Sequence, residues 1–530
     1  MGQRVLAIGL DGFEITLAER FVGEGLMPHF ARLAARSVRY TLDHGADKFS
    51  GLAWEHVSSG RAPSDGARWS AVTFDKNHYT ARQESTSYRP FLADVPLRSV
   101  VFDMPYCDLL AAPNVRGLTS WGAHDPGVAA LSTPRGLHTE LAKRFGPYPA
   151  SDWVYGFTWP SPERTRDSAA ALVRAVHLRA QAARWLLAER LTDWDLGLVV
   201  VSEPHSAIEP LWHGVDTSHP LHGLPSAKPA GEGLRAVYGA VDDLIGTLCE
   251  AFPEAIVVPF AMHGMGRNDA DVATMVLLPE LLHRNTFGRA HMREGNWPGR
   301  LPDGTPLMPD GQSWEDAIAE LVPRGAPPRA GFPGFVDRLR GWRLGSNGSV
   351  GALAWMPATR YQGFWPRMPA FALPAYYDGR VRVNLAGREA RGTVEATRYR
   401  ATLDSVATLL AECRDSITGR EVVDDIQIHT GDPSIVGPSQ SDMTILWRGT
   451  ALGLDHPRLG RIGPLPWRRT GGHTGDHGFL YILGTSLAPH DAGAGRSFDV
   501  VPTMLALAGA KPPPWLSGRV LREFSMEHQH

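Results

Sequence analysis

The sequence predicts an α/β fold with a mostly parallel β-sheet that is covered by helices on both faces. Apolar runs at residues 5–10, 197–201 and 255–261 have the length and composition of buried parallel strands. Helical tracts at residues 165–191 and 233–251 alternate with these strands. Strands that alternate with helices are typical of a parallel sheet between two layers of helices.

The other elements follow in order along the chain. The first strand leads into a helical tract over residues 13–36, and a short helix is predicted over residues 52–58. Residues 283–370, with a Pro-rich run at 324–328, predict a loop-rich insertion, because structureless stretches of this length are uncommon inside a compact domain. The remaining predictions are strands at 99–103, 381–384, 443–447 and 479–483 and helices at 396–413 and 500–508.

Charge and composition argue against nucleic acid and membranes as partners. A net charge of −3 over 530 residues leaves no basic footprint for nucleic acid or for an anionic membrane surface. The apolar stretches are well short of the roughly 20 residues that span a bilayer. The first strand begins at residue 5, which leaves no room for a signal peptide, and Cys107, Cys249 and Cys413 fit reduced thiols. We expect a cytoplasmic protein that binds a small molecule; its oligomeric state stays open.

Possible metal ligands follow each of the three apolar strands. Asp11 closes the first strand, His205 and Glu209 follow the second, and His263 follows the third. The carboxyl ends of parallel strands meet at one edge of a sheet, which is where open α/β sheets place their sites. His205 and Glu209 are four residues apart, so they share one face of a helix and can present an imidazole and a carboxylate to the same ion. A solvated contact at this spacing, and a tight-turn hydrogen bond for His263, are the structural alternatives.

A Gly-rich turn near the end of the chain carries His473, Asp476 and His477. Glycine lets a backbone fold closely around an ion, although a plain flexible loop has the same composition. Ser50 is the candidate nucleophile, since a serine hydroxyl becomes reactive beside a base or a metal, and a metal next to Asp11 would serve. Its alternative role is an N-cap of the helix at 52–58, and the two roles are compatible.

These residues carry a resemblance to a known family. With Asp11, Ser50 and the segment Ser58-Ser59-Gly60-Arg61-Ala62-Pro63, the chain resembles the alkaline phosphatase superfamily, in particular its type I phosphodiesterase and nucleotide pyrophosphatase branch. Further matching segments are residues 202–205 with Glu209, 262–264, 371–374, 378–384 and 499–503. The resemblance implies an alkaline-phosphatase-like sheet with an inserted cap. The implied divisions are the first part of the core at 1–284, the cap or insertion at 285–440 and the C-terminal part of the core at 441–530.

The metal ligands that the resemblance implies depart from the family pattern. The family supplies an Asp and, four residues on, a His, whereas this chain has His205 and Glu209 in the reverse order. Met262 stands where the family has an Asp, which leaves Asp11, Ser50 and His263 for the ion beside the nucleophile. The other ion would be held by His205, Glu209 and either His473 or His477. The resemblance thus implies one or two divalent ions, Zn in the first place, with Mn or Fe as alternatives.

The resemblance also implies an activity. We expect a metal-dependent hydrolase that acts on a small phosphorylated substrate, as a phosphodiesterase or phosphomonoesterase, through a covalent phospho-serine at Ser50. One alternative is non-hydrolytic group transfer at the same site; the other is a degenerate member that binds a phosphorylated ligand without turnover, which Met262 favours. Tryptophans of the insertion either line a pocket for an aromatic or sugar group or pack within the cap: Trp297, Trp314, Trp342, Trp355 and Trp365.

Overall fold

A nine-stranded, mostly parallel sheet forms the centre of the computed structural model, which describes residues 3–86, 88–156, 159–324 and 353–525. The predicted fold class is therefore confirmed. The strand order is β22-β2-β21-β9-β1-β8-β5-β6-β7. The bounds are β1 Val5–Leu10, β2 Val38–Asp43, β5 Ser99–Phe102, β6 Val115–Leu118, β7 Ser132–Thr133, β8 Leu196–Val201, β9 Ile256–Ala261, β21 Gly478–Ile482 and β22 His490–Arg496.

The middle of this sheet brings distant segments of the chain to one edge. Strands β9, β1, β8, β5 and β6 are parallel neighbours, with Val5 of β1 in register with Leu196 of β8 and Ile256 of β9. Their carboxyl ends therefore lie at the same edge. Strand β21 runs antiparallel to β9 and pairs Phe479 with Ala261. The turn that precedes β21 consequently lies at this edge as well.

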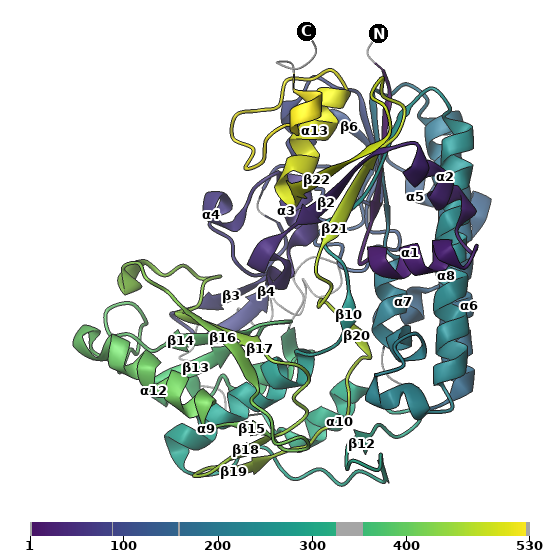
Figure 1. Cartoon of the computed structure of the whole chain (residues 1–530). Coiled ribbons are helices and arrows are strands. Elements are labelled where there is room, and N and C mark those ends of the chain that lie inside the picture. Colours follow the sequence, from purple (N-terminus) through teal and green to yellow (C-terminus); the bar gives the residue numbers. More distant parts are fainter. Residues whose placement is uncertain (1–2, 87, 157–158, 325–352, 526–530) are drawn as a thin grey trace.

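Helices cover both faces of the sheet, as Figure 1 shows. The side chains of β1 alternate between two hydrophobic clusters, because successive residues of a strand point to opposite faces. Leu6 and Ile8 pack in the cluster that contains α1, α2, α5, α6 and α8, whereas Val5 and Ala7 pack in the cluster that contains α3 and α13. The bounds are α1 Ile15–Gly23, α2 Pro28–Ala35, α3 Ala53–Ser59, α5 Leu137–Phe145, α6 Pro162–Trp185, α8 Ala227–Ala251 and α13 Val500–Leu507.

One predicted helical tract is two helices. Residues 13–36 form α1 and α2, which are separated at Gly25, where φ is 77°, and Pro28 occupies the first turn of α2. Glycine adopts this left-handed conformation without a steric penalty, and proline is tolerated only at the start of a helix. The two breakers together explain the split.

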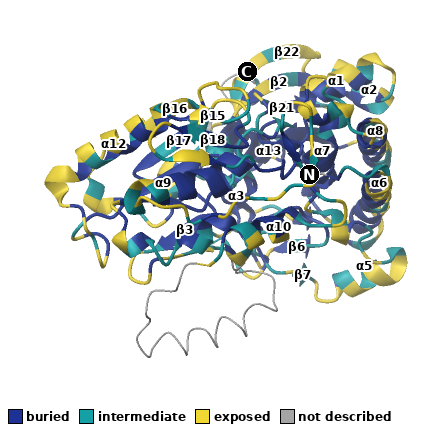
Figure 2. Ribbon diagram, turned by 90° about the horizontal axis from the view of Figure 1, so that it is seen from below, coloured by how far each residue is buried: buried dark blue, intermediate teal, exposed yellow. Residues whose placement is uncertain are grey.

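A second hydrophobic core lies beyond the carboxyl edge of the central sheet, below it in Figure 1. Its sheet is antiparallel, in the order β13-β14-β17-β16. The apolar residues of this core run from Val72 to Trp467 and so come from both sides of residues 284/285 and 440/441. Its elements are β13 Ala370–Leu373, β14 Gly379–Val383, β16 Val423–Ile428, β17 Met443–Trp447, α9 Leu278–Phe287, α10 Trp314–Leu321 and α12 Tyr399–Ala411. Figure 2 shows buried residues in both cores.

The segment expected to be a loop-rich insertion contains regular structure. Helix α10 begins after Ser313, whose side chain accepts a hydrogen bond from the backbone N–H of Asp316, and short 3-10 helices occupy Leu353–Trp355, Pro357–Tyr361 and Trp365–Arg367. Trp342 and residues 325–328 of the Pro-rich run lie outside the described residues. Among the helices of the described segments, none has the length and apolar character needed to cross a membrane.

Candidate functional site

The carboxyl edge of the sheet brings together five of the residues that the sequence predicted. Asp11 follows β1, and its carboxylate lies 3.2 Å from Nδ1 of His205. His205 and Glu209 share one face of α7, which spans Glu203–Leu211, and Nε2 of His205 lies 3.4 Å from Oε1 of Glu209. His473, from the turn before β21, places its Nε2 3.2 Å from Nε2 of His205. The His263 ring lies 4.7 Å from the His473 ring, and all five side chains are buried.

His124 joins this group, and sequence reasoning missed it. Its ring stacks on the His205 ring with 3.8 Å between centroids, and its Nε2 lies 3.4 Å from Oε1 of Glu209. Its Nδ1 lies 3.0 Å from Oγ of Ser206. His124 lies in the loop that follows β6, a four-residue strand whose Arg116 and Gly117 interrupt the apolar pattern. Only a prediction of that short strand from the sequence would have placed His124 at the carboxyl edge of the sheet.

The donor set fits a divalent metal. Ligand atoms of His124, His205 and Glu209 lie within 4.8 Å of one another. Separations of 3.2 to 3.4 Å between neighbouring donors match the edge of a tetrahedron with zinc bonds, about 3.3 Å. The buried Glu209 carboxylate faces Nε2 of both His124 and His205, and burial of its charge is costly without a cation. Asp11 on Nδ1 of His205 and Ser206 on Nδ1 of His124 are partners of the kind that orient metal-binding imidazoles.

Arg469 is the cation that lies against Glu209 in this structure. Its guanidinium forms an ion pair with Oε1 of Glu209, and burial lowers the pKa of Arg469 to about 10. A metal at the site therefore competes with this guanidinium for the carboxylate. Arg469 lies two residues before the short strand β20, Gly471–Gly472, and no motif marked it in the sequence.

Burial favours the neutral form of three imidazoles of the site, those of His124, His263 and His473. It lowers the pKa of His124 to about 3 and that of His263 to about 4, and it holds the pKa of His473 well below its ordinary value. Burial alone would raise the pKa of Asp11, but the charge of His205 and the hydrogen bond between the two side chains outweigh it, so the pKa is lowered. Neutral imidazole and ionised carboxylate are the forms that bind a metal.

Two more buried histidines, His44 and His56, lie near His263. Nε2 of His44 lies 3.1 Å from Nδ1 of His56, and the His44 ring lies 5.9 Å from the His263 ring. Nδ1 of His263 donates to the carbonyl oxygen of Gly264 over 2.9 Å, so Nε2 is the nitrogen that can act as an acceptor or a ligand. His477, by contrast, is half-buried and interacts electrostatically with Glu14. Of the two late histidines, His473 is therefore the one in contact with His205.

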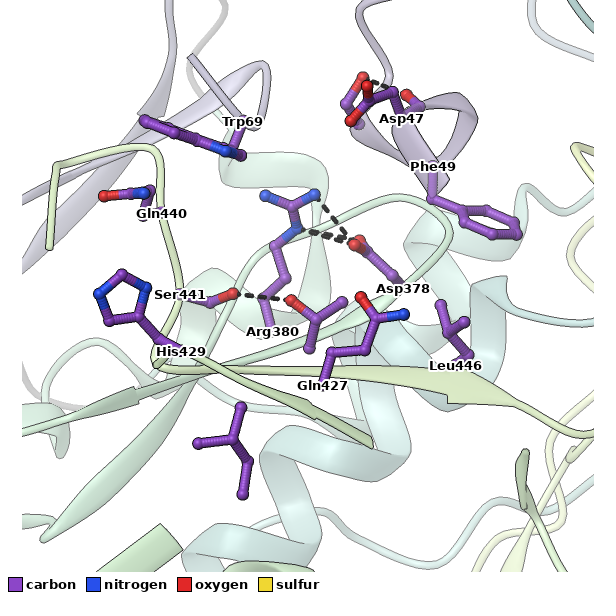
Figure 3. A pocket seen from close by; sticks show the side chains of 13 residues that line it. Asp47, Phe49, Trp69, Asp378, Arg380, Gln427, His429, Gln440, Ser441 and Leu446 are labelled. Atoms are coloured by element: carbon purple, nitrogen blue, oxygen red, sulfur yellow. Dashed lines mark hydrogen bonds and ion pairs between the residues drawn. The ribbon is translucent and has the colours of Figure 1, made fainter. Parts of the chain in front are cut away.

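Ser50 lies at the end of the 3-10 helix Gly45–Ser50. Its Oγ donates to the carbonyl oxygen of Asp47 over 2.7 Å and accepts from the backbone N–H of Leu52 over 3.1 Å. Helix α3 starts one residue later, so these bonds brace the turn before the helix. Ser50 also lines a cavity of about 220 Å³, which Figure 3 shows.

A second cavity, of about 440 Å³, opens beside His124. Arg469 and several aromatic side chains line it: Tyr155, Trp355, Tyr376 and Tyr377. Tyr377 also stacks on His473 with 3.9 Å between ring centroids. Ser50 and His124 thus line different cavities. Of the tryptophans considered from the sequence, Trp355 lines the larger cavity, whereas Trp297, Trp314 and Trp365 pack in the second core.

A buried guanidinium bridges the segment that carries His124 and the helix that carries His205 and Glu209. Arg179 of α6 is fully buried; its Nη1 lies 2.8 Å from Oδ2 of Asp103, and its Nε lies 2.9 Å from Oε2 of Glu203. Glu203 is the first residue of α7. The Asp103 carboxylate accepts the backbone N–H groups of Trp121 and Gly122 over 2.7 and 2.8 Å, next to His124. One side chain therefore links the His124 loop to the helix of His205 and Glu209.

No protein-family model matches the chain, and no curated protein matches it. Similar solved structures include phosphonoacetate hydrolase from Sinorhizobium meliloti 1021 in complex with phosphonoformate, at 13% identity over 96% of each chain with a TM-score of 0.44. Another is murine ectonucleotide pyrophosphatase/phosphodiesterase 5, an inactive form in complex with AMP, at 11% identity over 97% of this chain and 96% of that chain with a TM-score of 0.44.

Proposed function

We propose that the chain is a metal-dependent hydrolase of phosphate esters whose metal is held by His124, His205 and Glu209, with His473 as a further ligand. The observation that carries this proposal is the convergence of these buried donors at the carboxyl ends of parallel strands, with neighbouring atoms 3.2 to 3.4 Å apart. Three imidazoles and a carboxylate suit zinc.

The chain's own residues would position the substrate. A bound divalent ion would neutralise charge on the phosphate oxygens. Arg469 lines the larger cavity, and a guanidinium matches the geometry of a phosphate group. If the metal takes over Glu209, Arg469 is released from that carboxylate for an anionic substrate. Asp11 would accept a hydrogen bond from Nδ1–H of His205, and this bond would leave Nε2 of His205 available to the metal.

Ser50 is the proposed nucleophile, and its support comes from the family resemblance rather than from contact with the metal-binding group. Ser50 lines the smaller cavity, and the ring of Tyr376, which lines the larger one, lies 3.4 Å from the position of a Cβ built on Gly51. The covalent route therefore needs a substrate that reaches across both cavities or a movement of Tyr376. A phosphodiester, which carries an organic group on each side of its phosphorus, suits the first of these conditions.

The test joins metal analysis to a screen of phosphomonoesters and phosphodiesters. We expect fewer than two tightly bound ions per chain, since Met262 supplies no carboxylate beside His263. Glu209→Gln and His205→Ala should lower metal content and activity together, with partial recovery in excess metal, because a weakened ligand set raises the dissociation constant without destroying the site.

Matched variants separate the ligands from their neighbours. His473→Ala should lower metal content, whereas His477→Ala should retain it, and Leu110→Ala, at a side chain that is 77% exposed, controls for handling. Unchanged metal content in both Glu209→Gln and His205→Ala would overturn the ligand assignment. Two equivalents of metal that survive dialysis against a mild chelator would contradict the expected stoichiometry.

A further inference from the structure

We propose that the cavity beside Ser50 binds a neutral polyhydroxyl group, a sugar or polyol ring, carried by the phosphate ester. This inference rests on the proposed function and names the substrate class. The cavity of about 220 Å³ lies between the two cores, with Ser50 in its wall. Asp378 directly precedes β14, Arg380 lies in it, and Thr444 comes from β17. Its size suits a single ring-sized group.

Charge in the wall excludes an anion. The lining carboxylates, Asp47 and Asp378, outnumber the single guanidinium of Arg380. Nε of Arg380 donates to both oxygens of Asp378 over 3.0 and 3.1 Å, so the guanidinium is already engaged by a carboxylate. Figure 3 shows this pair facing the cavity near Trp69. A phosphate placed here would meet net negative charge, so the phosphate stays outside and its organic group enters.

The remaining wall matches hydroxyl groups. A hydroxyl both donates and accepts, so it can satisfy carboxylates, amides and other hydroxyls in one ring of contacts. The hydroxyls of Ser441 and Thr444 lie 3.0 Å apart at the wall. Nε2 of His429, which also lines the cavity, is buried and finds no hydrogen-bond partner within residues 3–86, 88–156, 159–324 and 353–525. A polyol adds hydrogen bonds to these side chains that an apolar ring cannot make.

Aromatic side chains complete the recognition of a ring. Trp69 and Phe49 line the cavity and are half-buried, so they offer apolar faces to the C–H groups of a sugar while its hydroxyls face the polar side chains. Binding sites commonly combine aromatic walls with a few placed polar groups in this way. A site built to bond hydroxyls rejects analogues that lack them, because its own polar groups then lose their partners.

The test compares two esters of the same ring size, glucosyl phosphate and cyclohexyl phosphate, with the full-length, metal-loaded protein. We expect kcat/KM to be at least about tenfold higher for the glucosyl ester, since each lost hydrogen bond to a polar wall costs about that factor. Thr444→Val, which keeps the shape, should reduce this preference severalfold, whereas Trp69→Ala should lower kcat/KM for both esters, because either ring can pack on the indole. Leu110→Ala, far more exposed than any of these side chains, should keep the preference.

Calorimetry can measure the binding of the two esters to the Ser50→Ala variant. This measurement tests the polyol site without hydrolysis and so separates it from the proposed function. Tighter binding of the glucosyl ester, abolished by Thr444→Val, would support the polyol site even if neither ester were hydrolysed, and the proposed function alone would then fail. Hydrolysis of both esters at equal rates would overturn the polyol site and leave the proposed function standing. A preference that survives Thr444→Val, or stronger binding of aminoethyl phosphate than of the glucosyl ester, would also overturn it.

Discussion

The side of the site that is proposed to bind the metal and the side that carries Ser50 are held in very different ways. His124, His205 and Glu209 lie on segments that a fully buried Arg179 joins through Asp103 and Glu203. Ser50 lies on a 3-10 helix whose residues 47–49 are only half-buried. This difference indicates that metal binding and nucleophilic attack, the two parts of the proposed reaction, place different demands on rigidity. Metal ligands require fixed positions, whereas a loop that meets a substrate gains from adjustment.

The largest effect is expected on the Ser50 side, in activity alone. Ser50→Ala should lower turnover by about a thousandfold or more, because the remaining groups can bind and polarise the ester but cannot form the phospho-serine. Metal content should be unchanged, and the loss of two local hydrogen bonds should cost about 1 kcal/mol of stability. Steady-state kinetics and metal analysis check both parts. Turnover equal to that of the wild type would show that the covalent mechanism is wrong.

The metal-binding side should respond to Arg179→Met in both stability and metal affinity. The substitution leaves the Asp103 and Glu203 carboxylates buried without their counter-ion, and such a change costs about 3–5 kcal/mol. The His124 loop and α7 also lose their common anchor, so metal should bind more weakly. Urea unfolding measures the first effect, and competition with a chelator measures the second.

A triple variant separates charge from positioning on this side. Arg179→Met combined with Asp103→Asn and Glu203→Gln removes the unpaired charges and should recover part of the stability. If Arg179 positions the ligands, metal affinity stays low in the triple variant. Recovery of metal affinity in step with stability would mean that the network only stabilises the fold.

The site residues that the sequence could predict lie mainly on the side proposed to bind the metal, directly after long apolar strands or on a helix face. Asp11, His205 and His263 follow long apolar strands, and parallel strands must deliver their exit loops to one edge. The spacing of His205 and Glu209 fixes a shared helix face. These placements need only periodicity and sheet topology. The contact of His473 rather than His477 with His205 depended on the antiparallel entry of β21, which the sequence alone does not specify.

The remaining features depend on tertiary packing. His124 follows a four-residue strand with little apolar pattern, and Arg469 reaches Glu209 from a segment without periodicity. The second core draws residues from Val72 to Trp467, and such long-range assembly leaves no local signal. Ser50 was identified through motif spacing, but spacing could not reveal which cavity its side chain lines. Local rules thus place strand ends and helix faces, while cavity walls arise from segments far apart in the sequence.

The smallest effect is expected from Lys48→Met, which tests whether the Ser50 side is loosely held. Nζ of Lys48 donates to the carbonyl oxygen of Gly475 over 2.9 Å and so joins the Ser50 loop to the turn that carries His473. Burial lowers the pKa of Lys48, so the half-buried ammonium gains little from this bond beyond its desolvation. We expect a loss of stability of about 1 kcal/mol, because one hydrogen bond between loops contributes about that much, and unchanged metal content, because His124, His205 and Glu209 lie on other segments. Methionine keeps the length and apolar contacts of the lysine stem, so the change isolates the ammonium group. Urea unfolding and metal analysis, side by side with Arg179→Met, provide the measurement. A loss as large as that of Arg179→Met, or a fall in metal content, would show that the Ser50 side is as rigidly coupled to the ligands as the side anchored by Arg179.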